Sequence, residues 1–168
     1  MVDTRKTFTD ERGWLFEYFR QEQLPSVINQ VTVFHCDSNT LRGMRVHIVR
    51  HEYVVVVQGS LRLGLYDLRE GSPSFRACGT VELEAKVPKV VCLPAGVAHG
   101  MCFNSDGVYL NAFSPYWSGE DEMEIRYNDP SLTVDWGMSN PVVCAKDLAG
   151  YSVEEAIAEY NKRVKALS

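Results

Sequence analysis

Residues that can exchange protons or bind anions gather in three short segments of the chain. The segment Arg42–His47 leads to Glu52, the turn LPAGVAHG carries His99, and the third segment contains Tyr116. Imidazole, carboxylate and phenol groups are the usual general acids and bases, and a guanidinium binds a phosphate through paired hydrogen bonds. These residue types together indicate proton-transfer chemistry on an anionic ligand.

Side chains from these segments converge only if the backbone around them forms strands. Arg45 and His47 are two residues apart, so on a strand they point to the same face. Polar side chains that project into a barrel from neighbouring strands are held rigidly, as a reaction site requires. A single histidine is more often a surface residue or a structural core residue. A tight turn at Pro94 and Gly96 directly before His99 favours a site.

The middle of the chain has the texture of strands separated by turns. Leu61–Arg69 alternates apolar and polar residues, and Tyr53–Val57 is a continuous apolar run typical of a strand buried on both faces, with Gln58–Ser60 as the hairpin turn. Further strands are predicted at Val31–Cys36, Gly79–Glu84, Val90–Leu93, Gly100–Phe103, Val108–Phe113 and Glu124–Tyr127. This spacing predicts an all-β sandwich or closed barrel over about residues 30–130.

The C-terminal segment changes to a helical period. Ser152 and Glu155 form a capping-box pattern, and apolar residues then recur at helical spacing. We expect one amphipathic helix from Val153 to about Lys165, packed on the outside of the barrel, with residues 1–168 forming a single domain.

Composition excludes several classes of protein. The net charge of −5 argues against a nucleic-acid or anionic-membrane surface, since both require a basic patch. The start of the chain lacks the apolar region of a secretory signal, and no apolar stretch is long enough to span a bilayer, so we expect a cytoplasmic protein. The five cysteines form no CxxC pair and are expected to be buried free thiols.

An ordered series of motifs resembles the dTDP-4-dehydrorhamnose 3,5-epimerase family over nearly the whole chain. The matching stretches are Asp10–Gly13 followed by Phe16 and Glu17; Leu41–Met44; Val57–Gly59; Tyr66–Arg69 with Ser72–Phe75; LPAGVAHG; Ser114–Tyr116; Asn128–Pro130; and Ala145–Asp147. The resemblance implies a cupin jelly-roll barrel, a homodimer, a nucleotide diphosphate-sugar as ligand, and no metal or other cofactor.

The resemblance also implies roles for individual residues. The family removes a proton beside a C4 ketone with a histidine base backed by an aspartate, and it uses a tyrosine as the acid. A lysine and a second histidine stabilise the enolate. Carried over to this chain, Tyr116 is the acid, His99 the second histidine and Asp147 the aspartate. The residues implied to contact the nucleotide are Arg42, which would bind the diphosphate, together with Arg12, Glu17 and Lys146.

Two positions depart from the family pattern. Arg45 stands where the family has its histidine base, and a guanidinium does not accept a proton at neutral pH. Glu52 stands where the family has its lysine, and a carboxylate would repel an enolate. We therefore expect the ordinary two-centre reaction to be very slow, with His47 as the substitute base and Arg45 held in a buried ion pair by Asp147 or Glu52.

Three functions remain open on the sequence alone. The first is an enzyme that transfers protons on a nucleotide-linked 4-keto-6-deoxy sugar in deoxysugar or polysaccharide synthesis. The second is a metal-dependent cupin that uses His47, Glu52 and His99, since two histidines and a carboxylate suit Fe(II) and related ions. The third is a sugar-nucleotide-binding barrel that has lost its chemistry, which the changes at Arg45 and Glu52 favour.

Overall fold

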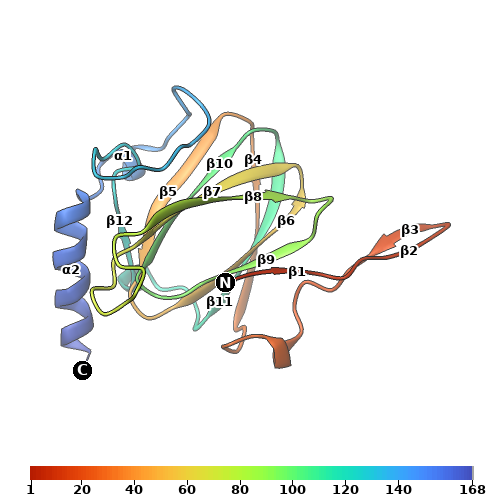
Figure 1. Cartoon of the computed structure of the whole chain (residues 1–168), viewed down its shortest axis with the longest axis horizontal. Coiled ribbons are helices and arrows are strands. Elements are labelled where there is room, and N and C mark those ends of the chain that lie inside the picture. The colour runs from red at the N-terminus through yellow and green to blue at the C-terminus, as the bar shows by residue number, and fades with distance from the viewer. Residues whose placement is uncertain (168) are drawn as a thin grey trace.

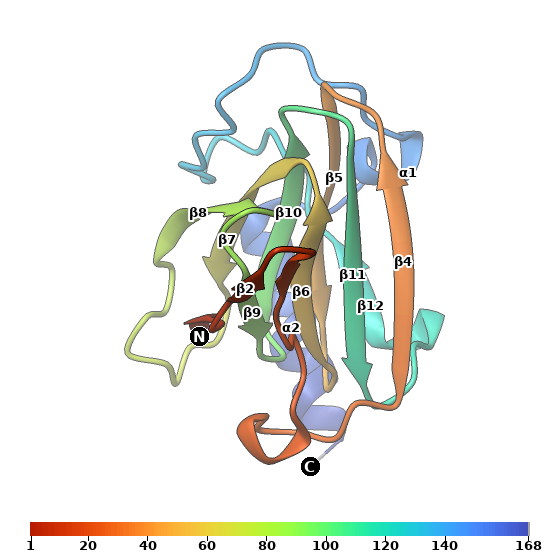
Figure 2. The same ribbon diagram turned by 90° about the vertical axis from the view of Figure 1, so that its right-hand side faces the viewer.

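Two antiparallel five-stranded sheets pack face to face in the computed structural model, which describes residues 1–167 (Figure 1). In order across the first sheet, the strands are β1 (Val2–Thr4), β9 (Lys89–Leu93), β6 (His51–Gln58), β11 (Gly107–Ser114) and β4 (Gln30–Cys36). In the second sheet they are β12 (Glu122–Glu124), β5 (Thr40–His47), β10 (Val97–Phe103), β7 (Ser60–Asp67) and β8 (Cys78–Glu84). Figure 2 shows β11 and β4 side by side at the edge of the first sheet.

The remaining elements lie outside this jelly roll. They are the hairpin β2 (Phe8–Asp10) and β3 (Gly13–Leu15), the 3₁₀ turns η1 (Gln21–Gln23) and η2 (Gly119–Asp121), and the helices α1 (Ala145–Leu148) and α2 (Val153–Ala166). The all-β fold is confirmed, and each of the eight strands expected from Val31 onward overlaps an observed one, although Glu124–Tyr127 shares only Glu124 with β12. Strand β5 was expected around Arg45 and His47 but without bounds. The three-residue strands β1 to β3 were not predicted, because strands so short and exposed show no apolar alternation.

Strand β6 explains the continuous apolar run in the sequence. Val54 and Val56 face the barrel interior, where they join the core cluster of Leu61, Leu63 and Phe103. Tyr53 and Val55 face outward and are covered by the segment that contains Tyr18, Phe19, Leu24 and Ile28. Both faces of this strand are therefore dry, as its composition predicts.

Helix α2 confirms the expected cap and its packing. The Ser152 hydroxyl accepts a hydrogen bond from the Glu155 amide, and the Glu155 carboxylate accepts one from the Ser152 amide. Val153, Ile157 and Tyr160 are buried in a cluster that extends to the outer face of the second sheet. The helix thus lies outside the barrel (Figure 1).

The cysteines are free, as expected, but their burial varies. Cys36 and Cys102 are buried, Cys78 and Cys92 are half-buried, and Cys144 is exposed, so the expectation of buried thiols is wrong for Cys144, which precedes α1 in a surface segment. No helix among residues 1–167 is long and apolar enough to cross a membrane.

A pair of glycines on neighbouring strands seats a tryptophan against the second sheet. Gly64 on β7 lies opposite Gly100 on β10. A Cβ atom at either position would lie 2.7 Å from the ring of Trp136. Trp136 also donates from Nε1 to the carbonyl of Tyr127 at 3.2 Å, and this hydrogen bond holds the ring against Gly64 and Gly100.

Replacing Gly64 with Ala is expected to destabilise the protein, because the added methyl group collides with Trp136 and Val134. Overpacking of this kind costs about 1–3 kcal/mol. Urea denaturation followed by circular dichroism would measure the change. Gly71→Ala is the matched control, since a Cβ there meets nothing within 4 Å; equal stability of the two variants would show that the ring moves aside freely.

Candidate functional site

A cavity of about 340 Å³ lies inside the barrel between the two sheets. Its walls combine aromatic and apolar side chains with charged ones, and its volume falls in the range of small-molecule sites. The charged side chains are Arg42, Arg45, His47, Arg50, Glu52, His99 and Glu122. The segments Arg42–His47 and LPAGVAHG therefore meet around one hollow, as the sequence predicts.

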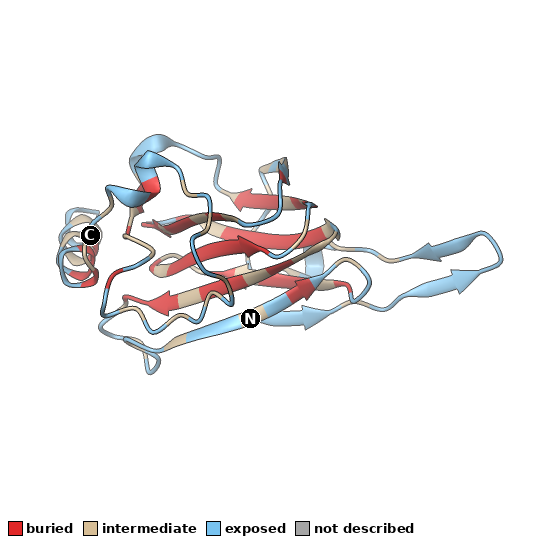
Figure 3. Ribbon diagram, turned by 90° about the horizontal axis from the view of Figure 1, so that it is seen from above, coloured by how far each residue is buried: buried red, intermediate tan, exposed pale blue. Residues whose placement is uncertain are grey.

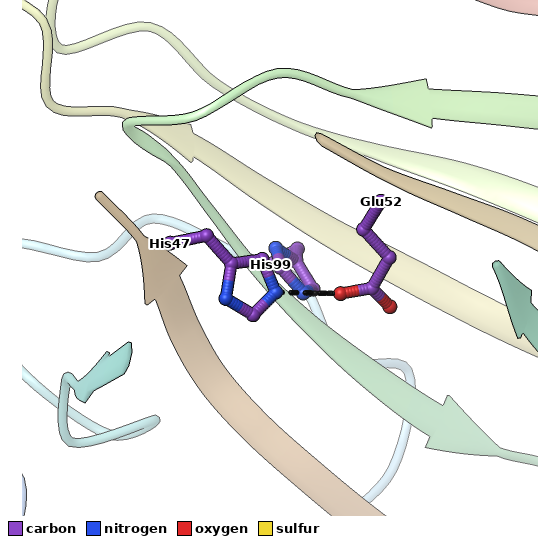
Figure 4. A group of neighbouring side chains, drawn as sticks. All are labelled: His47, Glu52 and His99. Carbon is purple, nitrogen blue, oxygen red and sulfur yellow. Dashed lines mark hydrogen bonds and ion pairs between the residues drawn. The ribbon is translucent and has the colours of Figure 1, made fainter. Parts of the chain in front are cut away.

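Two histidines and a glutamate are in contact in the wall of the cavity (Figure 4). His47 ends β5, Glu52 lies near the start of β6, and His99 lies in β10, so each is held by a different strand. His47 Nε2 lies 2.6 Å from Glu52 Oε2, and His99 Nε2 lies 3.2 Å from the same oxygen. All three side chains are buried. We call these three residues the buried triad.

The triad has an uneven distribution of charge. Burial opposes ionisation of Glu52, but the charge of His99 and hydrogen bonds from both histidines hold the pKa of this carboxyl well below its usual range. Burial would lower the pKa of His99, yet its pairing with Glu52 raises that pKa overall. Burial lowers the pKa of His47, and Glu52 offsets this only in part. Within the triad a proton is therefore favoured on His99 over His47, beside a Glu52 that is favoured as the carboxylate.

The donor atoms of the triad lie within 4.8 Å of one another, so the residues of the metal-dependent alternative are brought together. Two features oppose a divalent cation there. Arg45 and Arg50 line the same cavity with two positive charges. The buried Arg50 places Nη2 2.7 Å from His47 Nδ1 and 3.5 Å from His47 Nε2, so its positive charge lies against the ring that would have to bind the cation.

Arg45 forms the ion pair expected with Asp147. Its Nη2 lies 3.2 Å from Asp147 Oδ1, and its Nη1 lies 3.4 Å from Glu122 Oε1. The expected alternative partner, Glu52, is occupied by the two histidines instead. Asp147 also accepts a hydrogen bond from the Gly43 amide at 3.0 Å, so α1 fixes both the backbone and the charge at this position.

Other sequence-predicted residues lie outside the cavity. Tyr116 is 66 % exposed and lies two residues beyond the end of β11 at Ser114. The cavity is bordered there by Trp117 and by Phe113. Tyr116 therefore does not line the cavity that His99 borders, and its role as the acid stays a prediction.

Of the residues predicted to contact the nucleotide, one lines the cavity and the others lie outside it. Arg42 lines the cavity, with its guanidinium 5.1 Å from the Phe34 ring. Arg12 lies at the exposed tip of the β2–β3 hairpin and pairs with Asp10. The exposed Glu17 pairs with Arg20, and Lys146 pairs with Glu122 and Glu124 at 3.2 and 2.5 Å.

Several cavity residues were not predicted from the sequence, among them Asn111, Phe113, Glu122 and Arg50. Asn111 and Phe113 alternate along β11, so the period-two rule would have found them in the predicted strand Val108–Phe113. Glu122 lies in an acidic run that resembles a solvated surface, and Arg50 lies in the short connection between β5 and β6. No sequence pattern marks these last two as buried.

Comparison with known proteins gives one consistent family. The family model for dTDP-4-dehydrorhamnose 3,5-epimerase matches residues 1–155. The dTDP-4-dehydrorhamnose 3,5-epimerase of Salmonella typhimurium is 30 % identical over 165 residues, which cover 90 % of this chain and 89 % of that protein.

Solved structures agree with the sequence comparison. The Legionella pneumophila epimerase RmlC, in complex with dTDP-4-keto-L-rhamnose, matches with a TM-score of 0.87 and 26 % identity, covering 95 % of this chain and 90 % of that one. ChmJ, a 3'-monoepimerase from Streptomyces bikiniensis in complex with dTDP-quinovose, matches in fold with a TM-score of 0.86 and 22 % identity, covering 98 % and 93 %. The chain belongs to the dTDP-4-dehydrorhamnose 3,5-epimerase family.

Proposed function

We propose that this protein binds a nucleotide-linked 4-keto-6-deoxy sugar in the cavity and transfers a proton at a carbon beside the C4 ketone. The observation that carries this proposal is the buried triad. A general base and a charged donor are held together there in a dry wall, where electrostatic interactions are strong. Family membership and the size of the cavity support the same ligand.

In this proposal Glu52 is the general base and His99 is the hydrogen-bond donor to the enolate. Glu52 Oε2 is engaged by both histidines, while Glu52 Oε1 is buried and has no hydrogen-bond partner among the described residues. Oε1 takes the proton as the C–H bond breaks, and the electron pair moves onto the ketone oxygen. The contact between His99 Nε2 and Glu52 Oε2 is long at 3.2 Å, so the Nε2–H group is free to donate to the ketone oxygen. This hydrogen bond stabilises the enolate. Return of the proton restores the ketone.

Arg45 and Asp147 have a supporting role in the same scheme. Their ion pair fills the place of the family's base and its aspartate, so proton transfer passes to the triad. Arg42 binds the diphosphate. Among the described residues its guanidinium makes one hydrogen bond, a weak contact with the Cys36 sulfur at 3.7 Å. Its other N–H groups are therefore available to phosphate oxygens. Tyr116 is given no part in this scheme.

The proposal includes a homodimer and a cytoplasmic location. The β2–β3 hairpin projects from the barrel and is exposed on every residue (Figure 3). Trp14, 62 % exposed and stacked on Phe16, gives it an apolar surface that a second copy of the chain would cover. Arg12 and Glu17, in and just after this hairpin, would then contact the nucleotide bound in the cavity of the second copy. The five free cysteines support a reducing compartment.

Glu52→Gln is expected to slow solvent exchange at C3 or C5 of a dTDP-linked 4-keto-6-deoxy sugar by about 10²-fold or more, because the amide cannot accept the proton. Exchange would be followed by NMR in deuterium oxide. Glu82→Gln is the matched control, since Glu82 pairs with Arg62 on the barrel surface. If the unaltered protein binds dTDP in calorimetry but exchanges neither position, the non-catalytic alternative holds instead.

Arg45→His is expected to add exchange at a second carbon. A histidine there has a pKa near neutrality, and Asp147 is already in place to hold its ring. Arg45→Gln removes the charge without supplying a base and serves as the control. The same NMR assay compares both variants with the unaltered chain, and equal single-site exchange in the two variants would refute the assignment of position 45.

Trp14→Ser is expected to weaken the dimer, because it removes the largest apolar side chain of the projecting hairpin. Light scattering after gel filtration at several protein concentrations would report the monomer fraction. Trp117→Ser, at another half-exposed tryptophan near the cavity, is the comparison. A monomeric unaltered protein, or a dimer that is insensitive to Trp14→Ser, would count against the hairpin as the contact.

A further inference from the structure

Asn111 is a buried amide in the cavity wall, and the reaction proposed above gives it no role. It lies in the middle of β11, is 6 % exposed and lines the cavity. Its Oδ1 atom is buried and accepts no hydrogen bond from the described residues. A buried acceptor without a donor is costly, so such a group in a native protein calls for an explanation.

The strands on either side of β11 supply no donor to this oxygen. Val54 on β6, directly opposite Asn111, is apolar. Thr32 lies opposite Asn111 on β4, and its Oγ1 accepts a hydrogen bond from Gln30 Nε2 at 3.3 Å. A donor for Asn111 therefore has to come from the cavity side.

The proposed proton acceptor lies close to Asn111 on the same wall. Glu52 Oε1 is the other buried acceptor in the cavity lining that has no hydrogen-bond partner among the described residues. Glu52 is directly opposite Phe113, two residues along β11 from Asn111, so Glu52 and Asn111 are diagonal neighbours on adjacent strands. Such neighbours lie about 7–8 Å apart, within reach of long side chains. One sugar ring can therefore contact both.

The proposed ligand has few groups that can donate a hydrogen bond to Asn111. In a nucleotide-linked 4-keto-6-deoxy hexose, C1 carries the diphosphate, C4 is the ketone, C5 carries the ring oxygen and C6 is a methyl group. The sugar keeps hydroxyl groups only at C2 and C3. A hydrogen bond to Asn111 thus turns the C2–C3 side of the ring toward Glu52, and the carbon beside the ketone on that side is C3.

We propose that Asn111 is a specificity-determining residue that accepts a hydrogen bond from the C2 or C3 hydroxyl and thereby directs proton transfer to C3. This inference rests on the proposed function. The C3–H bond breaks and Glu52 Oε1 takes the proton; the electron pair of that bond forms the C3–C4 double bond, and the carbonyl pair moves onto the C4 oxygen. With C5 in this place, the C6 methyl group and the ring oxygen would leave Asn111 without a donor, so reaction at C5 is disfavoured.

Calorimetry with dTDP-quinovose tests the contact, because this sugar keeps the C2 and C3 hydroxyls and has no ketone that could react. The unaltered protein should bind either the 2-deoxy or the 3-deoxy form of this ligand about 10-fold more weakly, since the missing donor leaves Asn111 unpaired. Asn111→Leu should bind dTDP-quinovose itself about 10-fold more weakly and lose this discrimination. Its affinity for dTDP, which has no sugar ring at this place, should be retained.

NMR in deuterium oxide tests where the proton is transferred. With a dTDP-linked 4-keto-6-deoxy sugar, we expect the unaltered protein to exchange the proton at C3 and not at C5. Asn111→Leu should slow the exchange at C3 by about 10-fold. Asn104→Leu is the matched control, since Asn104 is exposed between β10 and β11.

Exchange at C5 in preference to C3 would overturn the proposal. Equal binding of dTDP-quinovose and its two deoxy forms by the unaltered protein would also overturn it, because water would then satisfy Asn111; neither result depends on the folding of Asn111→Leu. The proposed function is scored separately. Discrimination among the three ligands without exchange at either carbon defeats proton transfer and leaves the hydroxyl contact standing, whereas failure to bind any dTDP ligand defeats both.

Discussion

The need to neutralise charge inside the barrel governs the structure around the cavity. Glu52 is a fully buried carboxylate, and an isolated charge in such a place is too costly to persist. Two histidines from different strands share one of its oxygens, so the three strands that carry them are tied together at the cavity wall. Arg45 in the same wall is neutralised separately, by Asp147 and Glu122.

The two family departures make sense as one rearrangement of charge. A histidine and a lysine in the family pattern become Arg45 and Glu52 here, so each position keeps a polar group but the signs are redistributed. Arg45 takes up the aspartate that would have backed the base. Glu52, relieved of any arginine partner, takes up His47 and His99. The cavity stays polar, while the proposed proton acceptor is no longer at position 45 on β5 but is Glu52 on β6.

Much of this arrangement could be predicted from the sequence, and what escaped prediction has physical causes. Period-two alternation and the capping box located the strands after residue 30 and the helix α2, because local sequence decides them. The pairing of Arg45 with Asp147 followed from charge and family position. The burial of Arg50 did not, because the short connection that carries it has no periodicity and its contacts come from β11 and β12. The exposure of Tyr116 also escaped prediction, because the segment after the strand end at Ser114 has no periodicity that indicates which side chains are buried.

The hydrogen bond between Asp147 and the Gly43 amide spans 104 positions in the chain. The barrel strands all precede residue 125, so the ribosome releases the whole sheet framework, with Glu122 as a partner for Arg45, before it releases Asp147. The second carboxylate of Arg45 therefore comes from outside the barrel, on α1, a helix of only four residues.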